Sequence, residues 1–479
     1  MTLRRLLVAS AVALTTLVPA GTASADAPSV RLVAASPQVT LYRGYRSVPL
    51  DLGVWAASAG GAFELRVSQA DYDQTPTAVQ VDADTGAVLR TVPGELLARR
   101  WAGLSGFLRV RFAAPSGRIY AKLFPFCPGS FDQQRLDDTG PVLPTYPNVC
   151  TTFSPFTKGM VWGIDPGWAV NPLSDQFGEG DGAAMNIPDG TYAVTVRVMP
   201  PYDDLFAIPA DNARVGLTAR VVTPKARHPG GTAAHRSTSP APDGPVPTIT
   251  NPDPATLPDL VGLPGWRVDI FHHNARDYLA FAATEWNAGP APLVVEGFRR
   301  PGTNIMDAYQ YFRDAQGTVV GRASVGAFDY DVRPGHEHWH FEQFARYSLY
   351  DLVHHELVRS KKQGFCIFPT DAIDLTVPGA AWQPWSFGLF SVCGTQTSMW
   401  VREDLDVGWG DTYFQFIPGQ SFNVTALPNG WYKIRIRVNP LGALYETSTT
   451  NDVQDRLVYL GGRPGARTVL AAPWHGIDP

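Results

Sequence analysis

The stretch Tyr192-Ala-Val-Thr-Val-Arg-Val198 alternates apolar and polar side chains along its whole length. Because successive side chains of a β-strand point to opposite faces, this alternation is typical of a strand with one buried face. The pattern recurs in Phe63-Glu-Leu-Arg-Val67 and Phe107-Leu-Arg-Val-Arg-Phe112, with segments rich in Gly, Pro and Asp between them. Helical periodicity is nearly absent apart from a turn around residues 94–101. The sequence therefore predicts an all-β fold.

A later part of the chain repeats this region. Gly190-Thr-Tyr192 corresponds to Gly430-Trp-Tyr432, 240 positions further on, and Arg197-Val-Met-Pro200 corresponds to Arg437-Val-Asn-Pro440 at the same offset. Gly167-Trp168 and Gly408-Trp409 match at nearly the same offset. We interpret the repeat as an internal duplication, which predicts two β-sandwich-like domains. The alternative is that two unrelated β-domains share turn residues that often precede strands.

A linker separates the two repeats. Residues 223–256 are rich in Pro, Gly, Ser and Thr and show no apolar period, which is typical of a flexible connection. Residues 26–222 form the predicted N-terminal β-domain, which contains no histidine and is therefore a degenerate copy without imidazole metal ligands. We expect this domain to be structural, adhesive or substrate-positioning. Catalysis is expected in residues 257–479.

The first 25 residues have the pattern of a secretory signal peptide. Arg4 and Arg5 precede an apolar run, and Ala23-Ser-Ala25 provides an A-x-A cleavage site. The apolar run is shorter than the ~20 residues that span a bilayer, which argues against a retained membrane anchor. The sequence predicts a secreted, extracellular protein that leaves the membrane after signal removal. We have no expectation for its oligomeric state.

The composition is that of an ordinary globular protein, with 44% hydrophobic and 17% charged residues, which excludes a disordered or fibrous chain. The formal net charge of −5 argues against nucleic acid or an anionic membrane as the main partner. Four cysteines in an oxidising compartment indicate disulfides, and we predict the pairs Cys127–Cys150 and Cys366–Cys393 from their proximity in sequence. Thiolate metal ligands are the alternative, but no C-x-x-C spacing is present.

Three of the ten histidines lie in Arg333-Pro-Gly-His-Glu-His-Trp-His-Phe-Glu342. In an extended segment His336, His338 and His340 would fall on one side, which predicts a metal site. A flat strand would hold the outer two α-carbons ~13 Å apart, so we expect the chain to bend near Pro334 and Gly335. Imidazole suits copper, zinc, iron or nickel. The alternative is a row of surface histidines.

Further motifs accompany the histidines in a fixed order. They are Leu257-Pro-Asp-Leu-Val261, then after the histidines Tyr347-Ser-Leu-Tyr-Asp-Leu352, Lys362 before Cys366, Asp411-Thr-Tyr413, Gly430-Trp-Tyr432, Val438-Asn-Pro440, and Glu446 with Asn451-Asp452. The ordered set resembles the catalytic domain of the lysyl oxidase family and covers about residues 257–459. Gly335 stands where animal members carry a cysteine, and residues 377–389, with Trp382 and Trp385, form an insertion that lines a substrate entrance or packs as a loop.

The resemblance implies a function and its cofactors. It places copper(II) on His336, His338 and His340, and it joins Lys362 and Tyr413 into lysine tyrosylquinone. Lys361 competes with Lys362 for this role, but Lys362 keeps the family's spacing to Phe365-Cys366. The implied enzyme is a secreted copper/quinone amine oxidase that converts primary amines, with peptidyl lysine as a candidate substrate, to aldehyde, ammonia and hydrogen peroxide with O2 and water.

Other roles follow less directly from the residues. Asp411 is a candidate base because alternation places it on the same face as Tyr413, and a turn or cap aspartate is the alternative. Glu342 is a candidate to orient a ligand imidazole. Two other functions compete with the oxidase. One is a non-catalytic secreted adhesion module that binds copper or zinc, and the other is a zinc hydrolase with Glu337 or Glu342 as base.

Overall fold

The structure is a computed structural model of the chain. It describes residues 27–44, 47–130, 132–150, 154–173, 183–223, 246–332, 337–362, 364–384, 393–414 and 419–477. The predicted signal peptide and most of the predicted linker lie outside these residues. Within them, α1 (Tyr202–Leu205) is the one α-helix, and strands form nearly all the other regular structure. The all-β prediction is confirmed. No helix in the described part of the chain is long and apolar enough to span a membrane.

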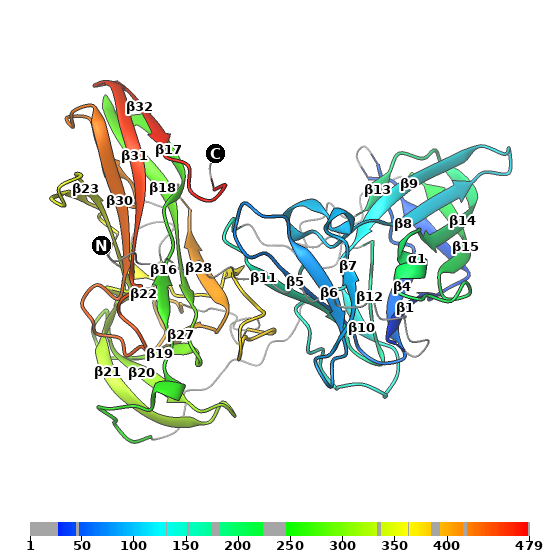
Figure 1. The fold of residues 1–479 in the computed structure, drawn as a ribbon, viewed down its shortest axis with the longest axis horizontal. Coiled ribbons are helices and arrows are strands. Elements are labelled where there is room, and N and C mark those ends of the chain that lie inside the picture. The colour runs from blue at the N-terminus through cyan, green and yellow to red at the C-terminus, as the bar shows by residue number, and fades with distance from the viewer. Residues whose placement is uncertain are drawn as a thin grey trace, which may run out of the picture.

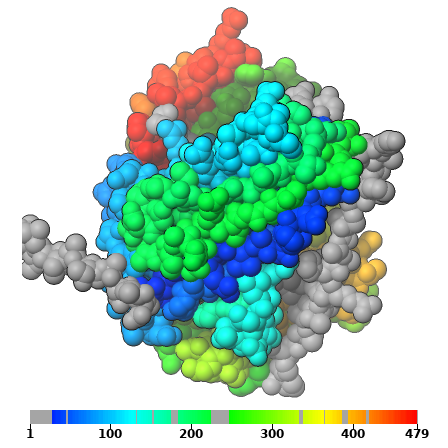
Figure 2. Space-filling model, turned by 90° about the vertical axis from the view of Figure 1, so that its right-hand side faces the viewer, coloured from blue at the N-terminus to red at the C-terminus, as the bar shows by residue number. Residues whose placement is uncertain are grey.

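The strands form two regions that lie side by side, one before residue 224 and one after residue 245 (Figure 1). Figure 2 looks onto the first region, whose blue, cyan and green surface fills most of that face. Short 3-10 turns cover Gly94–Leu96 and Arg99–Trp101, where the sequence indicates a turn, and Pro254–Thr256.

The first region contains three sheets of four or more strands and one short pair. In sheet order they are β1 (Ser29–Ala34), β4 (Val54–Ala59), β12 (Trp168–Val170) and β10 (Gln133–Arg135); β11 (Gly159–Ile164), β5 (Phe63–Ser68), β6 (Thr77–Val81) and β7 (Val88–Val92); β2 (Gln38–Tyr42), β15 (Arg214–Val222), β14 (Gly190–Val198), β8 (Leu104–Ala113) and β9 (Ile119–Phe126); and β13 (Ala184–Met185) with β3 (Val48–Pro49).

The second region contains three larger sheets. They are β16 (Leu260–Gly262), β18 (Arg276–Asn287), β28 (Trp409–Tyr413) and β26 (Asp371–Ala372), with β17 (Trp266–His273) and β29 (Phe422–Asn423) also pairing with β18; β25 (Gly364–Phe365), β22 (Trp339–Glu342), β21 (Val319–Tyr330), β20 (Ile305–Arg313), β19 (Leu293–Arg299) and β27 (Trp400–Leu405); and β24 (Glu356–Arg359), β23 (Ala345–Tyr350), β30 (Gly430–Val438), β31 (Val453–Arg463) and β32 (Ala466–Ala471).

The alternation in the sequence decides which side chains reach the core. Along β30, Tyr432, Ile434, Ile436 and Val438 are buried, while the residues between them are exposed or half-buried. The strand β14 shows the same sequence of burial. Burial of one apolar face of a strand is the main favourable term for forming such sheets.

The two regions share several local features. β14 is flanked by β15 and β8, and β30 is flanked in the same way by β31 and β23. The hydroxyl of Tyr192 donates to Pro188 O at 2.9 Å, and that of Tyr432 donates to Pro428 O at 2.7 Å. These features agree with an internal duplication, which stays a prediction.

Both predicted disulfides, Cys127–Cys150 and Cys366–Cys393, are formed. No cysteine is left free. Cys366 directly follows β25, so the second disulfide is anchored beside the strand that pairs with the histidine-bearing β22. This places a covalent constraint close to the predicted site.

Candidate active site

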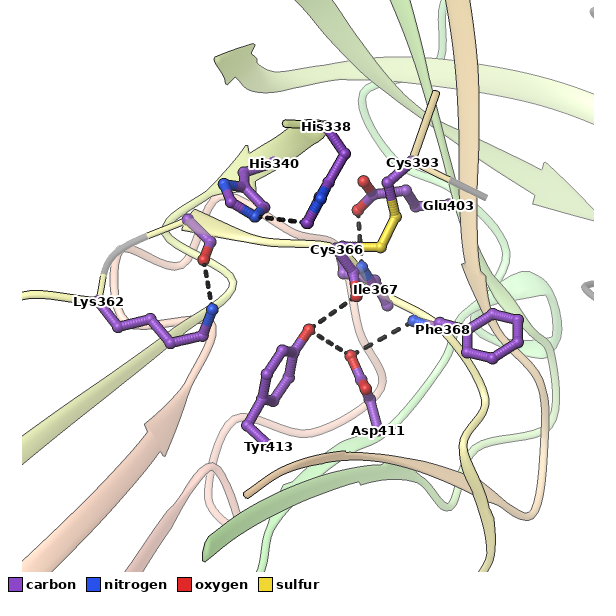
Figure 3. The surroundings of a disulfide bond; sticks show 11 residues. His338, His340, Lys362, Cys366, Ile367, Phe368, Cys393, Glu403, Asp411 and Tyr413 are labelled. Atoms are coloured by element: carbon purple, nitrogen blue, oxygen red, sulfur yellow. Dashed lines mark hydrogen bonds between the residues drawn. A yellow bond between two sulfur atoms is a disulfide. The ribbon is translucent and has the colours of Figure 1, made fainter. Parts of the chain in front are cut away.

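Three strands bring the predicted site residues together. β22 carries His340 and follows His338, while β28 carries Asp411 and Tyr413. β22 pairs with β25 through Phe341 and Phe365, so Lys362, just ahead of β25, comes to the same region. Figure 3 shows the two histidines, Lys362 and Tyr413 around the Cys366–Cys393 disulfide.

The two described histidines of the predicted triad point toward each other. Their Nε2 atoms are 2.9 Å apart, and His340 is 7% exposed. Two nitrogens that each lie ~2.05 Å from one metal ion at a right angle would be separated by ~2.9 Å. The same distance also suits a hydrogen bond between the rings. The donors therefore fit a metal ion held by imidazole nitrogen. His336, and with it the predicted bend, lies outside the described residues.

A carboxylate lies behind this pair. Asp331 Oδ2 is 3.8 Å from Nδ1 of His340, on the side of the ring away from His338. At 3.8 Å this is an electrostatic contact and not a hydrogen bond, and a carboxylate near the second ring nitrogen commonly accompanies a metal-binding imidazole. Sequence reasoning named Glu342 for this role and missed Asp331. Asp331 directly follows β21, which pairs with β22, so its place beside His340 depends on a strand pairing that the sequence does not display.

Lys362 lies over the aromatic ring of Tyr413. Its Nζ is 4.6 Å from the centroid of that ring and 4.6 Å from the centroid of the Phe365 ring, and it donates to Gly364 O at 3.0 Å. Lys362 is 8% exposed, whereas the neighbouring Lys361 is exposed. Burial of the lysine against two rings brings the amine close to the carbon atoms with which a cross-link would form. The arrangement favours Lys362 over Lys361.

The hydroxyl of Tyr413 is held by two oxygen atoms. It donates to Asp411 Oδ2 at 2.5 Å, and Cys366 O lies 2.8 Å away (Figure 3). Asp411 also accepts from the Phe368 amide at 3.3 Å. Burial raises the pKa of Asp411 to about 8, and burial together with the nearby Asp411 charge raises the pKa of Tyr413 well above its usual range. Asp411 is thus placed to receive the phenolic proton.

The comparison with protein families agrees with this geometry. Residues 315–465 match the family model of lysyl oxidase. The C-terminal region of the chain carries a lysyl oxidase domain. The match includes the three histidines, Lys362 and Tyr413, and it begins after Leu257-Pro-Asp-Leu-Val261. No curated protein matches the chain in a sequence search.

The second region buries two further acids beside the site, Glu403 within the lysyl oxidase match and Glu285 before it. Glu285 lies directly opposite Asp411 on the adjacent strand β18, and Glu403 on β27 accepts from the Ile367 amide at 2.8 Å. Both are fully buried, and burial raises the pKa of each carboxyl well above its ordinary value. Sequence reasoning did not find them. The available signal for Glu285 was an acid two residues after the apolar run Leu279-Ala-Phe-Ala-Ala283 and just before Trp286.

One further cluster in the lysyl oxidase domain resembles a metal site. Ligand atoms of Cys366, Cys393 and Glu403 all lie within 4.8 Å of one another. The two sulfur atoms are joined in a disulfide, so neither is available as a thiolate, which is the form that binds a metal. The histidine pair is therefore the better candidate for the metal centre.

The insertion in the lysyl oxidase domain packs against the first region. Trp382 stacks on Tyr146 with ring centroids 5.4 Å apart, and its Nε1 donates to Leu375 O at 3.1 Å. This contact supports the packing role rather than the substrate-entrance role for the described part of the insertion. Trp385 lies outside the described residues.

Proposed function

We propose that the lysyl oxidase domain is a copper-dependent amine oxidase. In this proposal it converts primary amines, peptidyl lysine among them, to aldehyde, ammonia and hydrogen peroxide with O2 and water. The observation that carries the proposal is the buried amine of Lys362 over the ring of Tyr413. A metal-binding module has no need for a buried lysine in contact with a tyrosine, because burying a lysine amine costs free energy.

The metal and the quinone would be held by this chain's own residues. His336, His338 and His340 would bind copper(II), and Lys362 and Tyr413 would be joined as lysine tyrosylquinone. Copper and the quinone supply the redox chemistry when present, together with an electrophilic carbonyl that reacts with an amine. Phe365 packs against both Lys362 and Tyr413 and so fixes their relative position.

Asp411 is the group that moves protons in this proposal. Its Oδ2 lies at the Tyr413 hydroxyl and can accept the phenolic proton. A carboxyl with a pKa of about 8 is partly ionised near neutral pH, so it can take up a proton and release it again. The same group is therefore our candidate base for removal of the proton next to the substrate nitrogen.

We further propose that the protein is secreted. The signal pattern of residues 1–25 and the two disulfides support this proposal, because disulfides persist in oxidising compartments. The N-terminal sequence of the protein recovered outside the cell should begin near Asp26. A chain that keeps Arg4 and Arg5 would contradict the proposal.

The decisive experiment combines a chemical and a kinetic readout. Copper-loaded protein is digested to test for a peptide pair joined through Lys362 and Tyr413, and peroxide release is measured with a panel of primary amines. Tyr413→Phe should abolish both the joined peptides and the peroxide. Tyr432→Phe is the matched control, because Tyr432 is equally buried, with 7% exposure, and its hydroxyl bonds only to Pro428 O among the described contacts.

The non-catalytic metal-binding module is the rival outcome of the same experiment. Fully copper-loaded protein with an unmodified Tyr413 peptide and no peroxide with any amine would support it. Peroxide release that persists in Tyr413→Phe would contradict the assignment of Tyr413 while leaving an oxidase in place.

A further inference from the structure

The first region forms hydrogen bonds with residues 372–375, which belong to a segment that also contacts Asp411 and Tyr413. The Lys158 amide donates to Ile373 O at 2.6 Å, and the Leu375 amide donates to Gly159 O at 2.9 Å. Gly159 and Asp374 form a parallel β-bridge, and Thr157 Oγ1 donates to Ala372 O at 3.0 Å. The edge of the sheet that contains β11 is thus joined to the edge of the sheet that contains β26 and β28. Figure 1 shows β11 as the part of the first region that faces β28.

The partner segment, residues 366–375, reaches the site at several points. Its Cys366 carbonyl lies at the Tyr413 hydroxyl, and its Phe368 amide donates to Asp411. The Thr412 amide donates to Thr370 Oγ1 at 2.8 Å, and β26 pairs with β28 through Asp371 and Gly410. A shift of this segment would therefore move the partners of both Asp411 and Tyr413.

The close approach depends on a glycine. A Cβ on Gly159 would lie 2.1 Å from Asp374 Oδ1 and 2.5 Å from Thr376 Oγ1. These two atoms cannot move away freely, because Thr376 Oγ1 donates to Asp374 Oδ1 at 2.5 Å and the Thr376 amide donates to the same oxygen at 2.9 Å. Any larger side chain at position 159 would force the two regions apart or break this turn.

A second contact acts on the same segment. The ring of Trp382 stacks on Tyr146 of the first region, while its Nε1 bonds to Leu375 O. The Ala381 amide donates to Val407 O, and the Trp409 Nε1 donates to Ala381 O. The first region thus also contacts Trp382, which directly follows the residue that bonds to Val407 and Trp409 at the start of β28.

We propose that the N-terminal region braces residues 366–375, so that Lys362 and Tyr413 are joined only when the two regions are docked. The inference rests on the proposed function and gives the histidine-free first region a positioning role in it. Joining the side chains adds one oxygen atom to the ring and removes four hydrogen atoms. Two molecules of O2 are the oxidant. One of their four oxygen atoms enters the ring, and the other three leave with the four hydrogen atoms as one water and one hydrogen peroxide. Small displacements of reacting groups reduce such rates by up to ~100-fold.

The test uses the full-length, copper-loaded chain and the variant Gly159→Val. Gly216→Val is the matched control, because Gly216 is also a strand glycine of the first region and its added Cβ would meet no atom closer than 3.8 Å. Three quantities are measured for each: amide exchange at Leu375, copper content, and the fraction of molecules with Lys362 joined to Tyr413. Trp382→Leu provides a second variant with a weakened contact in case Gly159→Val does not fold.

We expect Gly159→Val to exchange the Leu375 amide at least tenfold faster and to reduce the joined fraction at least fivefold at unchanged copper content. Gly216→Val should match the wild type in all three quantities. A joined fraction that stays at the wild-type level although Leu375 exchanges faster would overturn the brace, as would a copper content that falls in parallel. Unchanged exchange in both Gly159→Val and Trp382→Leu would also refute it. Wild-type protein that never forms the joined pair overturns the proposed function instead, and the brace with it.

Discussion

Glu285 and Asp411 face each other across the antiparallel strands β18 and β28, and both carboxyl groups are buried. Two positions further along the same register, on the same face of the sheet, Ala283 pairs with Tyr413, so a small residue lies opposite the tyrosine of the site. Two buried acids side by side cannot both be charged without a large free-energy cost. Burial and the charge of Asp411 both raise the pKa of Glu285 well above its ordinary value, which favours the neutral form of Glu285.

The pH dependence of activity should follow Asp411. If Asp411 acts as the base, kcat/KM for peroxide release should rise with pH and level off above about 8, the pKa of its carboxyl. Asp411→Asn should lower kcat by ~100-fold to ~10,000-fold and remove this rise. Asp307→Asn is the control, since Asp307 lies in an ion pair with Arg300 outside the site. An unchanged pH profile in Asp411→Asn would assign the base to another group.

The stability of the domain should fall as the pH rises. The pKa of Asp411 is raised from 3.8 to about 8 in the folded state, so the unfolded chain loses this proton first as the pH increases. The free energy of unfolding should therefore decrease between pH 4 and about 8, by up to ~1.4 kcal/mol per pH unit for this group. Denaturant titrations of Asp411→Asn should show a shallower decrease, and an equal slope would contradict the raised pKa.

The histidine pair should determine metal affinity. His340→Ala should weaken copper binding by at least ~100-fold, because it removes one donor of the pair whose Nε2 atoms are 2.9 Å apart. Asp331→Asn should weaken it by a smaller factor, through the lost partner of Nδ1. His355→Ala should leave the affinity unchanged, because His355 is exposed and pairs with Asp351. Titration calorimetry with copper measures the affinity of all three variants. Equal affinities would indicate that copper binds at another site.

The two disulfides should differ in their effect on the site. Their sequence separations are 23 and 27 residues, which predicts a loss of ~3.5 kcal/mol in unfolding free energy when either one is replaced by two serines. Only loss of Cys366–Cys393 should also reduce the joined fraction of Lys362 and Tyr413, because Cys366 O lies at the Tyr413 hydroxyl. The Cys127–Cys150 variant is the control, and an equal reduction in both would point to a general loss of folded protein.

Local patterns in the sequence were enough for several features. The alternation of Tyr192 to Val198 predicted β14, and the even number of cysteines in neighbouring pairs predicted both disulfides. The order of motifs led to the lysyl oxidase family, which the match of residues 315–465 supports. Such features depend on residues close together in the chain or on a fixed order, and both are visible without a fold.

Tertiary structure alone decided which distant residues meet. The pairing and packing of strands far apart in sequence place Glu285 opposite Asp411 and Asp331 near His340. They also bring Gly159 against the turn that contains Asp374. The alternation along a strand indicates which of its faces is buried but not which strand pairs with it. A shift of one residue in the pairing register would turn every side chain of the strand to the opposite face. The sequence by itself therefore determined the kinds of element and the family, whereas the register between strands decided the partners of the site.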